Sequence, residues 1–385
     1  MSETGSKYDV IVIGGGIAGA SVAAELAADR VVALLEGEAQ PGYHSTGRSA
    51  AVFMPSYGPP VIRALTRASG AFFESPPGDI EHPLLHHRGA LFIAREDQIA
   101  ALERMRADQA DVTPVAAPRE AVPLLREGYA AGAAYDPRAS DLDVAALHQH
   151  YLRRLRSAGG VLRSGAAVRA LRRAEGCWEV ATSAGTAAAP VVVNAAGAWA
   201  DVVAGLAGVA PLGLVPKRRT AMIVEPPADA ALTAGLDAWP LVVDIDEEFY
   251  LKPEAGKLLI SPADATPTEP GDVQPEELDV AIGVDRIERA FALSIRRIER
   301  KWAGLRSFLA DGDPAAGFAP EAEGFFWLAG QGGYGIQSAP ALARSAAALV
   351  RGEALPADIR AEGATPEALS PVRPSLRAAA EAPVV

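Results

Sequence analysis

The sequence contains few of the cysteine and histidine residues that form disulfide cross-links and metal centres. Cys177 is the only cysteine in 385 residues, which excludes an internal disulfide and any metal site made of several thiolates. The six histidines form no metal-ligand pattern, and we expect no bound metal. Cys177 stands in a strand-like segment, where we expect a small buried residue.

Positive charge is also scarce. Lys and Arg number 36 against 48 Asp and Glu, which gives a formal net charge of −12. A protein that binds nucleic acid normally presents a basic face to the phosphates. We therefore expect no nucleic-acid partner.

Long apolar stretches are missing as well. The N-terminal segment lacks the positive charge of a secretory signal, and its apolar part breaks at Gly14. A transmembrane helix needs about 20 consecutive apolar residues. We expect a cytoplasmic protein without a membrane span.

A glycine turn between a strand and a helix is the first sign of chemistry. Residues 8–13 form the apolar run of a strand buried on both faces, and residues 17–27 have helical composition. The glycines in G-x-G-x-x-G spacing are Gly14, Gly16 and Gly19. They permit a tight turn and the close approach of a pyrophosphate to the backbone, at a helix N-terminus that favours anions.

An acidic residue strengthens the dinucleotide interpretation. Residues 30–35 read as a second buried strand that ends at Glu36. A carboxylate there can accept hydrogen bonds from both ribose hydroxyls and repels a 2′-phosphate. Residues 44–58, HSTGRSAAVFMPSYG, follow soon after and change from small polar residues to an apolar patch. Such a loop suits the pyrophosphate and polar ring edge of a flavin at one end and a pocket wall at the other, which favours FAD over NAD.

Several longer motifs give the chain a resemblance to a known family. GYHSTGRSA, YDPRASDLDVAALH, NAAGAW, PLGLVPKRR, FYLKPEAG, WAGLRSF and QGGYGIQ together resemble the FAD-dependent D-amino-acid dehydrogenases of the D-amino-acid oxidase superfamily, most closely the bacterial D-arginine dehydrogenases. The resemblance extends over roughly residues 8–375. Covalent attachment of the flavin needs a suitably placed Cys, His or Tyr, and the only thiol lies far from the QGGYGIQ segment. We therefore expect FAD to be bound without a covalent bond.

The cofactor residues that the glycine turn, the loop and the resemblance indicate can be named. Val168 matches an adenine-side backbone contact of the family, and Gly197 marks a second glycine turn. The full expected set is Gly14, Gly16, Ala18, Gly19, Glu36, Gly37, Ser45, Thr46, Gly47, Arg48, Ser49, Ala50, Ala51, Val168, Gly197, Gly332, Gly333, Tyr334, Gly335, Ile336 and Gln337.

The fold class that we expect is α/β, or α+β overall, with two domains. The 49% hydrophobic content is ample for two cores. The resemblance implies a Rossmann-like FAD-binding domain and a substrate domain with a mixed, largely antiparallel sheet, as in D-amino-acid oxidase. We assign residues 1–80, 135–210 and 306–385 to the first and residues 81–134 and 211–305 to the second. In the first, Asp141 or Asp143 is a candidate helix cap.

An amino-acid substrate needs a clamp for its carboxylate. Arg306 is the best candidate, because a guanidinium binds a carboxylate through two parallel hydrogen bonds. Arg219 adds a second cation, Tyr57 and Tyr250 add hydroxyls, and Gly333 offers its backbone to the substrate amine. An arginine or tyrosine is more often a surface or core residue, but here each coincides with a family motif.

The sequence departs from the D-arginine dehydrogenase pattern in the side-chain pocket. Ala90 stands where the family has a glutamate that faces the substrate guanidinium, and Val52 and Met54 replace a histidine and a threonine. Leu241 and Val243 continue the apolar wall, and Tyr334 completes the expected pocket. Burying an unpaired charge is costly, so we expect neutral, apolar side chains to be preferred over basic ones.

The implied reaction is oxidative deamination of a D-amino acid. Hydride passes from the substrate Cα to N5 of the flavin, and the imino acid hydrolyses to a 2-keto acid and ammonia. The electron acceptor is a quinone, a carrier or oxygen. The alternatives are a sarcosine- or glycine-oxidase-like enzyme, an NAD-dependent dehydrogenase and a non-catalytic flavoprotein.

Overall fold

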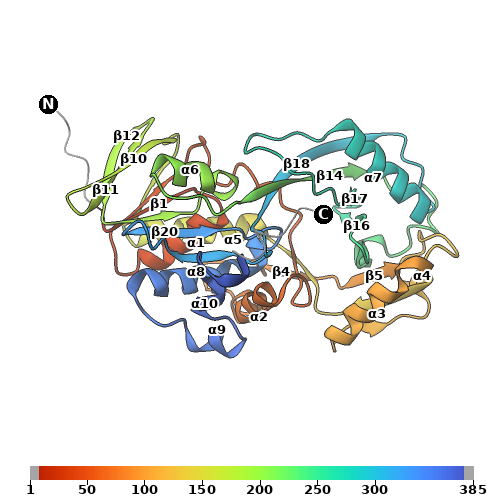
Figure 1. Cartoon of the computed structure of the whole chain (residues 1–385). Coiled ribbons are helices and arrows are strands. Elements are labelled where there is room, and N and C mark those ends of the chain that lie inside the picture. The colour runs from red at the N-terminus through yellow and green to blue at the C-terminus, as the bar shows by residue number, and fades with distance from the viewer. Residues whose placement is uncertain (1–7, 377–385) are drawn as a thin grey trace.

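The computed structural model describes residues 8–376, and it has two lobes joined by extended segments (Figure 1). The first lobe is built on a six-stranded sheet. Its strands are parallel except for β19, which pairs antiparallel with β20. The order across the sheet is β19 (Ala315–Phe318), β20 (Phe325–Ala329), β13 (Val191–Asn194), β1 (Val10–Ile13), β2 (Val32–Leu35) and β9 (Val161–Arg163).

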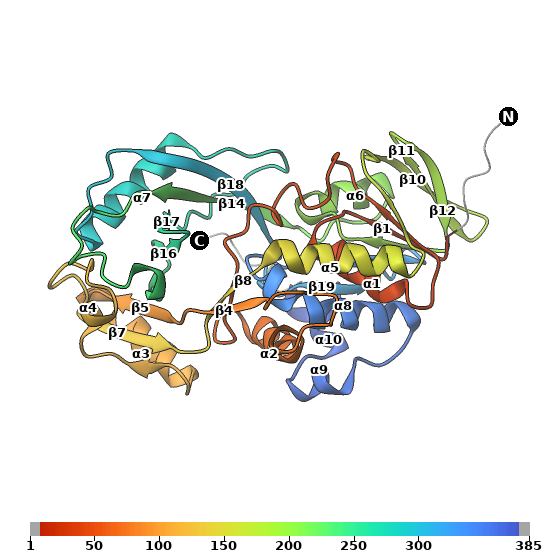
Figure 2. The ribbon, with the colours of Figure 1, turned by 180° about the vertical axis from the view of Figure 1, so that it is seen from behind.

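Both faces of this sheet are covered, which explains the continuous apolar run in β1. Val10 and Val12 belong to the apolar cluster on one face, and Ile11 and Ile13 belong to the cluster on the other. The first face carries α1 (Ile17–Leu26), α2 (Pro60–Glu74), α5 (Val144–Ser157) and α8 (Gly335–Arg351), and Figure 2 shows α5 and α1 side by side. The second face carries α6 (Ala200–Leu206) and a sheet of β10 (Val168–Ala174), β11 (Cys177–Thr182) and β12 (Gly185–Ala189).

Two predictions from short sequence patterns in this lobe can be compared with the structure, the cap of the helix after residue 143 and the burial of Cys177. The Asp143 carboxylate caps α5 by accepting a hydrogen bond from the Ala146 amide at 2.8 Å, whereas Asp141 pairs with Arg88 and Lys252 instead. The expectation for Cys177 was partly wrong, because it opens strand β11 but is only half-buried. Cys177 is the first residue of its strand, paired with Ala174 next to the hairpin turn, where fewer neighbours cover a side chain.

The second lobe is built on an eight-stranded sheet that is antiparallel except between β15 and β5. The predicted hairpin at residues 249–261 is present as its strands β16 and β17. The order is β18 (Ile298–Phe308), β14 (Val215–Val224), β17 (Lys257–Ser261), β16 (Tyr250–Glu254), β15 (Leu241–Asp244), β5 (Ala90–Ala94), β7 (Gly132–Asp136) and β6 (Thr113–Pro114).

The two faces of this sheet have different partners. Leu91 and Ile93 of β5 pack into a core beneath α7 (Glu277–Ala290), while Ala90, Phe92 and Ala94 point to the opposite face, toward Met54 of the first lobe. The alternation in β5 therefore places one set of side chains beneath α7 and the other set in a second cluster, which includes Leu102 of the same lobe and Met54 of the first lobe.

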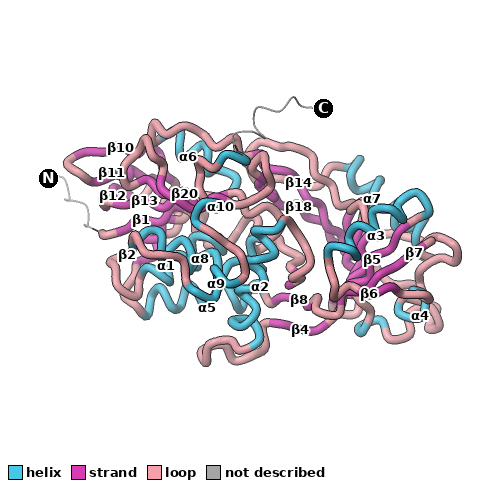
Figure 3. Tube along the Cα trace, turned by 60° about the horizontal axis from the view of Figure 1, so that its bottom comes forward, coloured by secondary structure: helices cyan, strands magenta, loops and turns pink. Residues whose placement is uncertain are grey.

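A small sheet connects the lobes. β8 (Ser140–Leu142) lies between β3 (Val52–Phe53) and β4 (Leu85–His87), and Figure 3 shows β8 and β4 in the space between the two lobes. The remaining short elements are η1 (Glu96–Gln98), α3 (Ile99–Asp108), α4 (Pro118–Ala121), η2 (Gly197–Trp199), η3 (Leu236–Ala238), α9 (Ala357–Ala361) and α10 (Pro366–Leu369). Within residues 8–376, none of the helices combines the length and the apolarity that crossing a membrane requires.

We propose the two discontinuous domains expected from the sequence, with slightly different limits. The six- and eight-stranded sheets support the division. However, the boundaries at 134/135 and 305/306 cut through β7 and β18, and both strands pair along their length within the eight-stranded sheet. We therefore place those limits at the ends of the two strands.

Candidate functional site

The glycine turn has the geometry that its spacing predicts. Gly14 has a φ of 104°, and a Cβ there would lie 2.4 Å from the Ala195 carbonyl oxygen. A Cβ on Gly19 would lie 1.8 Å from the Gly14 carbonyl oxygen. Glycine is therefore required at both positions, the first for the turn and the second for close packing of α1 on it.

Glu36 lies at the end of β2, beside this turn. Its carboxylate accepts hydrogen bonds from the Gly15 amide at 2.7 Å and the Glu38 amide at 2.8 Å. These bonds fix the carboxylate at the rim of a cavity that it also lines. This is the position from which an acid can bind a ribose.

The loop after β2 is anchored on α1 and on the second lobe. Thr46 Oγ1 accepts a hydrogen bond from the Ile17 amide at 3.0 Å, and Ser45 Oγ donates to the Leu305 carbonyl at 2.6 Å. The Arg48 guanidinium, which we expected on the cofactor, instead donates to the Asp272 carboxylate and to the Ala303 carbonyl. Arg48 thus holds the two lobes together, and its charge is already neutralised.

A cavity of about 380 Å³ opens between the glycine turn, Glu36 and α6; we call it the glycine-loop cavity. Gly19 and Gly47 do not line it, because Gly19 packs under the turn and the Gly47 amide bonds to Gly42 inside the loop. The expected cofactor residues that do line it are Gly14, Gly16, Ala18, Glu36, Gly37, Ser45, Thr46, Val168, Gly197, Gly332 and Gly335.

The glycine-loop cavity also has lining residues that the sequence did not point to. His44 and Trp199 lie with their ring centroids 4.6 Å apart, and Val202 and Leu206 of α6 extend an apolar wall. Val202 and Leu206 are exposed by 51% and 38%, which is unusual for apolar residues on a helix that covers a sheet. Trp199 is the last residue of the NAAGAW motif, two positions after Gly197, and this was the available signal for it.

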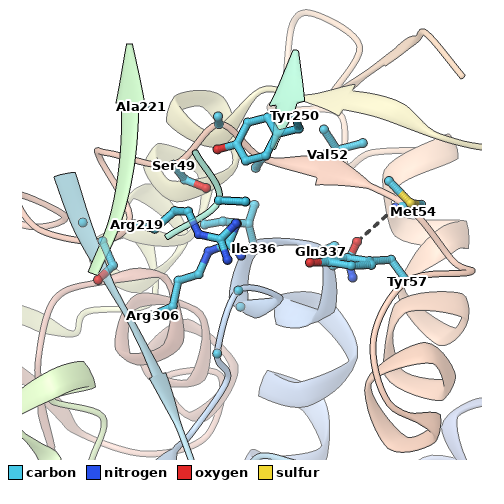
Figure 4. A pocket seen from close by; sticks show the side chains of 18 of the residues that line it. Ser49, Val52, Met54, Tyr57, Arg219, Ala221, Tyr250, Arg306, Ile336 and Gln337 are labelled. Atoms are coloured by element: carbon cyan, nitrogen blue, oxygen red, sulfur yellow. Dashed lines mark hydrogen bonds between the residues drawn. The ribbon is translucent and has the colours of Figure 1, made fainter. Parts of the chain in front are cut away.

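A second cavity of about 180 Å³ continues from the first toward the eight-stranded sheet; we call it the arginine cavity. The two share lining residues, among them Thr46, Gly332 and Gly335, so one long ligand can extend through both. The expected residues in its lining are Arg48, Ser49, Ala50, Ala51, Val52, Met54, Tyr57, Arg219, Leu241, Val243, Tyr250, Arg306, Gly333, Ile336 and Gln337. Figure 4 shows many of them, with Arg219 and Arg306 pointing toward one another.

Two expected pocket residues do not line the arginine cavity. Ala90 is 0% exposed, packed behind Met54 and Leu241 on β5. The Tyr334 ring packs edge-on against Tyr57, with centroids 5.1 Å apart. The lining also includes residues that the sequence did not single out, among them Phe92, Glu247 and Lys252.

Two guanidinium groups in the arginine cavity lack ordinary partners. Arg306 makes no side-chain hydrogen bond or ion pair with another residue of the described part of the chain. The Arg219 Nε is buried without a hydrogen-bond partner, and the nearest carboxylate oxygen, on Glu247, is 4.0 Å from its Nη2. Burial, followed by the neighbouring Arg306, lowers the pKa of Arg219. Buried cations in proteins are normally paired, so the pair forms a site for an anion.

Neutral donors complete the arginine cavity. Burial raises the pKa of Tyr57 far above its ordinary value, with Glu247 adding to the effect, so its hydroxyl keeps its proton. Gln337, 4% exposed, accepts a hydrogen bond from the Met54 amide at 3.0 Å, while its Nε2 has no partner within residues 8–376. Helix α8 begins at Gly335, one residue before the predicted start, and directs its N-terminus to the cavity.

These features are typical of one class of protein, the dinucleotide-dependent enzymes. They are a Rossmann-like domain with a glycine turn, an acid at the end of its second strand, and an adjoining cavity for an anion. The family model described as FAD dependent oxidoreductase matches residues 9–349. The chain belongs to this family, and FAD is its cofactor. The glycine-loop cavity fits FAD, because the glycine turn at the start of α1 and the Glu36 carboxylate both line it, and because it shares lining residues with the arginine cavity.

Individual relatives agree with the family assignment. Glycine oxidase from Geobacillus kaustophilus is 26% identical, with a TM-score of 0.76 over 90% of this chain and 95% of that one. Mouse mitochondrial sarcosine dehydrogenase is 26% identical over 67% of this chain and 32% of its own length. FAD-dependent oxidoreductase domain-containing protein 1 of Xenopus laevis is 27% identical over 42% of this chain and 34% of its own. The chain thus spans about a third of the length of these two curated relatives.

Proposed function

We propose that this protein oxidises a D-amino acid at its Cα, with FAD as the oxidant. The observation that carries the proposal is the Arg306 guanidinium, which has no partner among residues 8–376 and lies against Gly333 in a segment that lines both cavities. An α-carboxylate is the planar anion that a guanidinium binds best. The names of glycine oxidase and sarcosine dehydrogenase support an amino-acid substrate.

The residues of the cavity have distinct parts in the proposed reaction. Arg306, with Arg219, holds the substrate carboxylate, and the Tyr57 and Tyr250 hydroxyls donate hydrogen bonds beside it. The backbone of Gly333 faces the substrate amine. FAD, when bound, supplies the hydride acceptor at N5. The protein contributes orientation and electrostatic stabilisation, and no strong base is required once the amine is neutral.

The wall opposite the clamp supports neutral, apolar side chains. Val52, Met54, Phe92, Leu241 and Val243 line it, and each buried methylene contributes roughly 0.8 kcal/mol. Glu247 is the only carboxylate in the lining within residues 8–376, and it faces Arg219. A substrate guanidinium or ammonium would compete with Arg219 for it. A specific closeness to the D-arginine dehydrogenases stays a prediction, as does the cytoplasmic location.

A glycine- or sarcosine-oxidase-like reaction is the second candidate, favoured by the identity to glycine oxidase. The experiment that separates the two is product analysis with an artificial electron acceptor. We expect D-leucine and D-methionine to yield their 2-keto acids and ammonia faster than glycine yields glyoxylate and ammonia. They should also react faster than sarcosine, whether sarcosine yields glycine and formaldehyde or glyoxylate and methylamine. The reverse order would replace the proposal with the second candidate, and no turnover of any amine would indicate a non-catalytic flavoprotein. A parallel assay in air separates oxygen from a quinone or carrier as the acceptor.

A further inference from the structure

We propose that Glu247 is an internal counter-ion of the carboxylate site. Glu247 pairs with Arg219 while the site is empty and gives up Arg219 when a substrate carboxylate binds. This competition sets the affinity for the carboxylate. The inference rests on the proposed function, from which it takes the assumption that the ligand binds through a carboxylate. It adds a specificity-determining residue, because an acid at this place opposes a second acidic group on the substrate.

The charges around the arginine cavity single out Glu247. Charged side chains of the described residues line it at five positions: Arg48, Arg219, Glu247, Lys252 and Arg306. Arg48 is neutralised by Asp272, and Lys252 lies 2.9 Å from Asp141 and 2.8 Å from Glu254. Two cations and the Glu247 carboxylate are left, so the net charge of +1 matches a single carboxylate.

The backbone holds Glu247 in a conformation that L residues rarely adopt. Its φ is 56°, and the positive-φ residues other than glycine within residues 8–376 are Glu175, Glu247, Ala255 and Ala263. Glu175, Glu247 and Ala255 all stand in turns between paired antiparallel strands. Of these three, Glu247 lines the cavity, as does Ala263. Unfavourable backbone conformations that line a site point to a functional constraint.

Hydrogen bonds to the buried residue Asp244 hold the turn that carries Glu247. The Asp244 side chain, 0% exposed, accepts hydrogen bonds from the Asp246 amide at 3.1 Å and from Gln98 Nε2 at 3.0 Å. The Glu247 amide donates to the Asp244 carbonyl at 2.9 Å. The Glu247 side chain is therefore presented to the cavity by a fixed turn.

The ion pair itself is easy to break. The atoms of Arg219 and Glu247 are 4.0 Å apart, and the Glu247 side chain is 43% exposed against 12% for Arg219. Long, partly solvated pairs contribute little. A substrate carboxylate can approach the same guanidinium more closely, and Glu247 can turn to water. Because substrate and Glu247 compete for one cation, removing the negative charge must strengthen carboxylate binding.

The test uses benzoate as a probe of the holoenzyme and follows the flavin absorbance change on binding. In Glu247→Gln we expect the Kd of benzoate to fall about fivefold, the upper range for a partly exposed pair. The matched control is Asp246→Asn, which removes the same charge from the same turn at an exposed position outside the cavity lining. We expect its Kd to stay within twofold of the wild type.

A second pair of variants tests the partner. In an Arg219→Met background, Glu247→Gln should leave the Kd of benzoate unchanged, because the cation for which the two compete is gone. Any one of four results would overturn the inference. The Kd of benzoate could fall equally in the Arg219→Met background, fall equally in Asp246→Asn, or not fall in Glu247→Gln, or the protein could fail to bind benzoate. The readout needs no turnover. A protein that binds benzoate as expected but oxidises no D-amino acid would contradict the proposed function and leave the counter-ion role standing.

Discussion

The guanidinium of Arg306 lies directly against the α-carbon of Gly333. A Cβ on Gly333 would be 2.9 Å from the Arg306 Cζ and 2.9 Å from its Nη1. The relation ties the end of strand β18 to the loop before helix α8, and so places the proposed carboxylate clamp on the segment that faces the flavin.

This contact gives a first prediction. Gly333 has no positive φ, so alanine is compatible with the backbone, but its methyl group would displace the guanidinium. We expect Gly333→Ala to raise the KM of the amino-acid substrate about 10- to 100-fold, the scale of one charge-assisted hydrogen bond. FAD content should be retained. The matched control is Gly304→Ala, whose Cβ would lie 3.5 Å from Arg48 in ordinary contact. Equal KM values in both variants would argue against the clamp.

The apolar wall leads to a prediction on substrate choice. We expect kcat/KM for D-norleucine to exceed that for D-lysine, which differs from it by the terminal ammonium, because that ammonium would have to compete with Arg219 for Glu247, the one carboxylate in the cavity lining within residues 8–376. Val243→Glu should raise the ratio of D-lysine to D-norleucine activity about tenfold. Ala90→Glu is no longer the right variant, since Ala90 is buried behind the lining. A wild-type preference for D-lysine would contradict this account of the wall.

The flavin should be bound without a covalent bond. Cys177 stands on β11 of the three-stranded sheet and lines neither cavity. Acid precipitation of the purified protein should leave a colourless pellet and release the yellow FAD to the supernatant. A pellet that keeps its flavin would show attachment through a residue that does line the site, with His44 or a tyrosine to be examined first by peptide mapping.

Stability should change with pH through Asp313. Burial, together with its neighbour Asp311, raises the pKa of the Asp313 carboxyl to about 6, and its Oδ1 has no hydrogen-bond partner within residues 8–376. A raised carboxyl pKa means that the fold favours the protonated form, so stability falls as pH rises from about 4 through 6. Asp313→Asn should unfold like the wild type at about pH 4, near the unfolded-state pKa, where the wild type has lost little of this contribution. At pH 8 we expect its midpoint to be about 1–2 °C higher, since solvent screening reduces the effect to about 1 kcal/mol. A lower midpoint at pH 8 would contradict this.

Local patterns in the sequence predicted much of the fold. The apolar run of β1, the glycine turn, the Asp143 cap and the hairpin of β16 and β17 each follow from a few adjacent residues. Their limits differ by a residue or two, because helix and strand ends depend on tertiary packing.

The parts that could not be predicted depend on partners far along the chain. Arg48 turns away from the cofactor because Asp272, 224 positions later, accepts its hydrogen bond. Ala90 lies on the face of β5 that points to the cavity, yet Met54 and Leu241 cover it. Glu247 enters the site through a left-handed turn that no propensity favours for glutamate. Periodicity gives the face of a strand, but not which side chain on that face meets the ligand.

The central claim is that a D-amino acid, held by Arg306, reduces the flavin. Its most direct test is the second-order rate of anaerobic flavin bleaching by D-leucine, measured side by side in the wild type and in Arg306→Met. We expect bleaching in the wild type and a rate lower by about two to four orders of magnitude in the variant, the equivalent of about 3–5 kcal/mol of lost transition-state stabilisation. A wild type that D-leucine does not bleach, or a variant that bleaches at the same rate, would contradict the account.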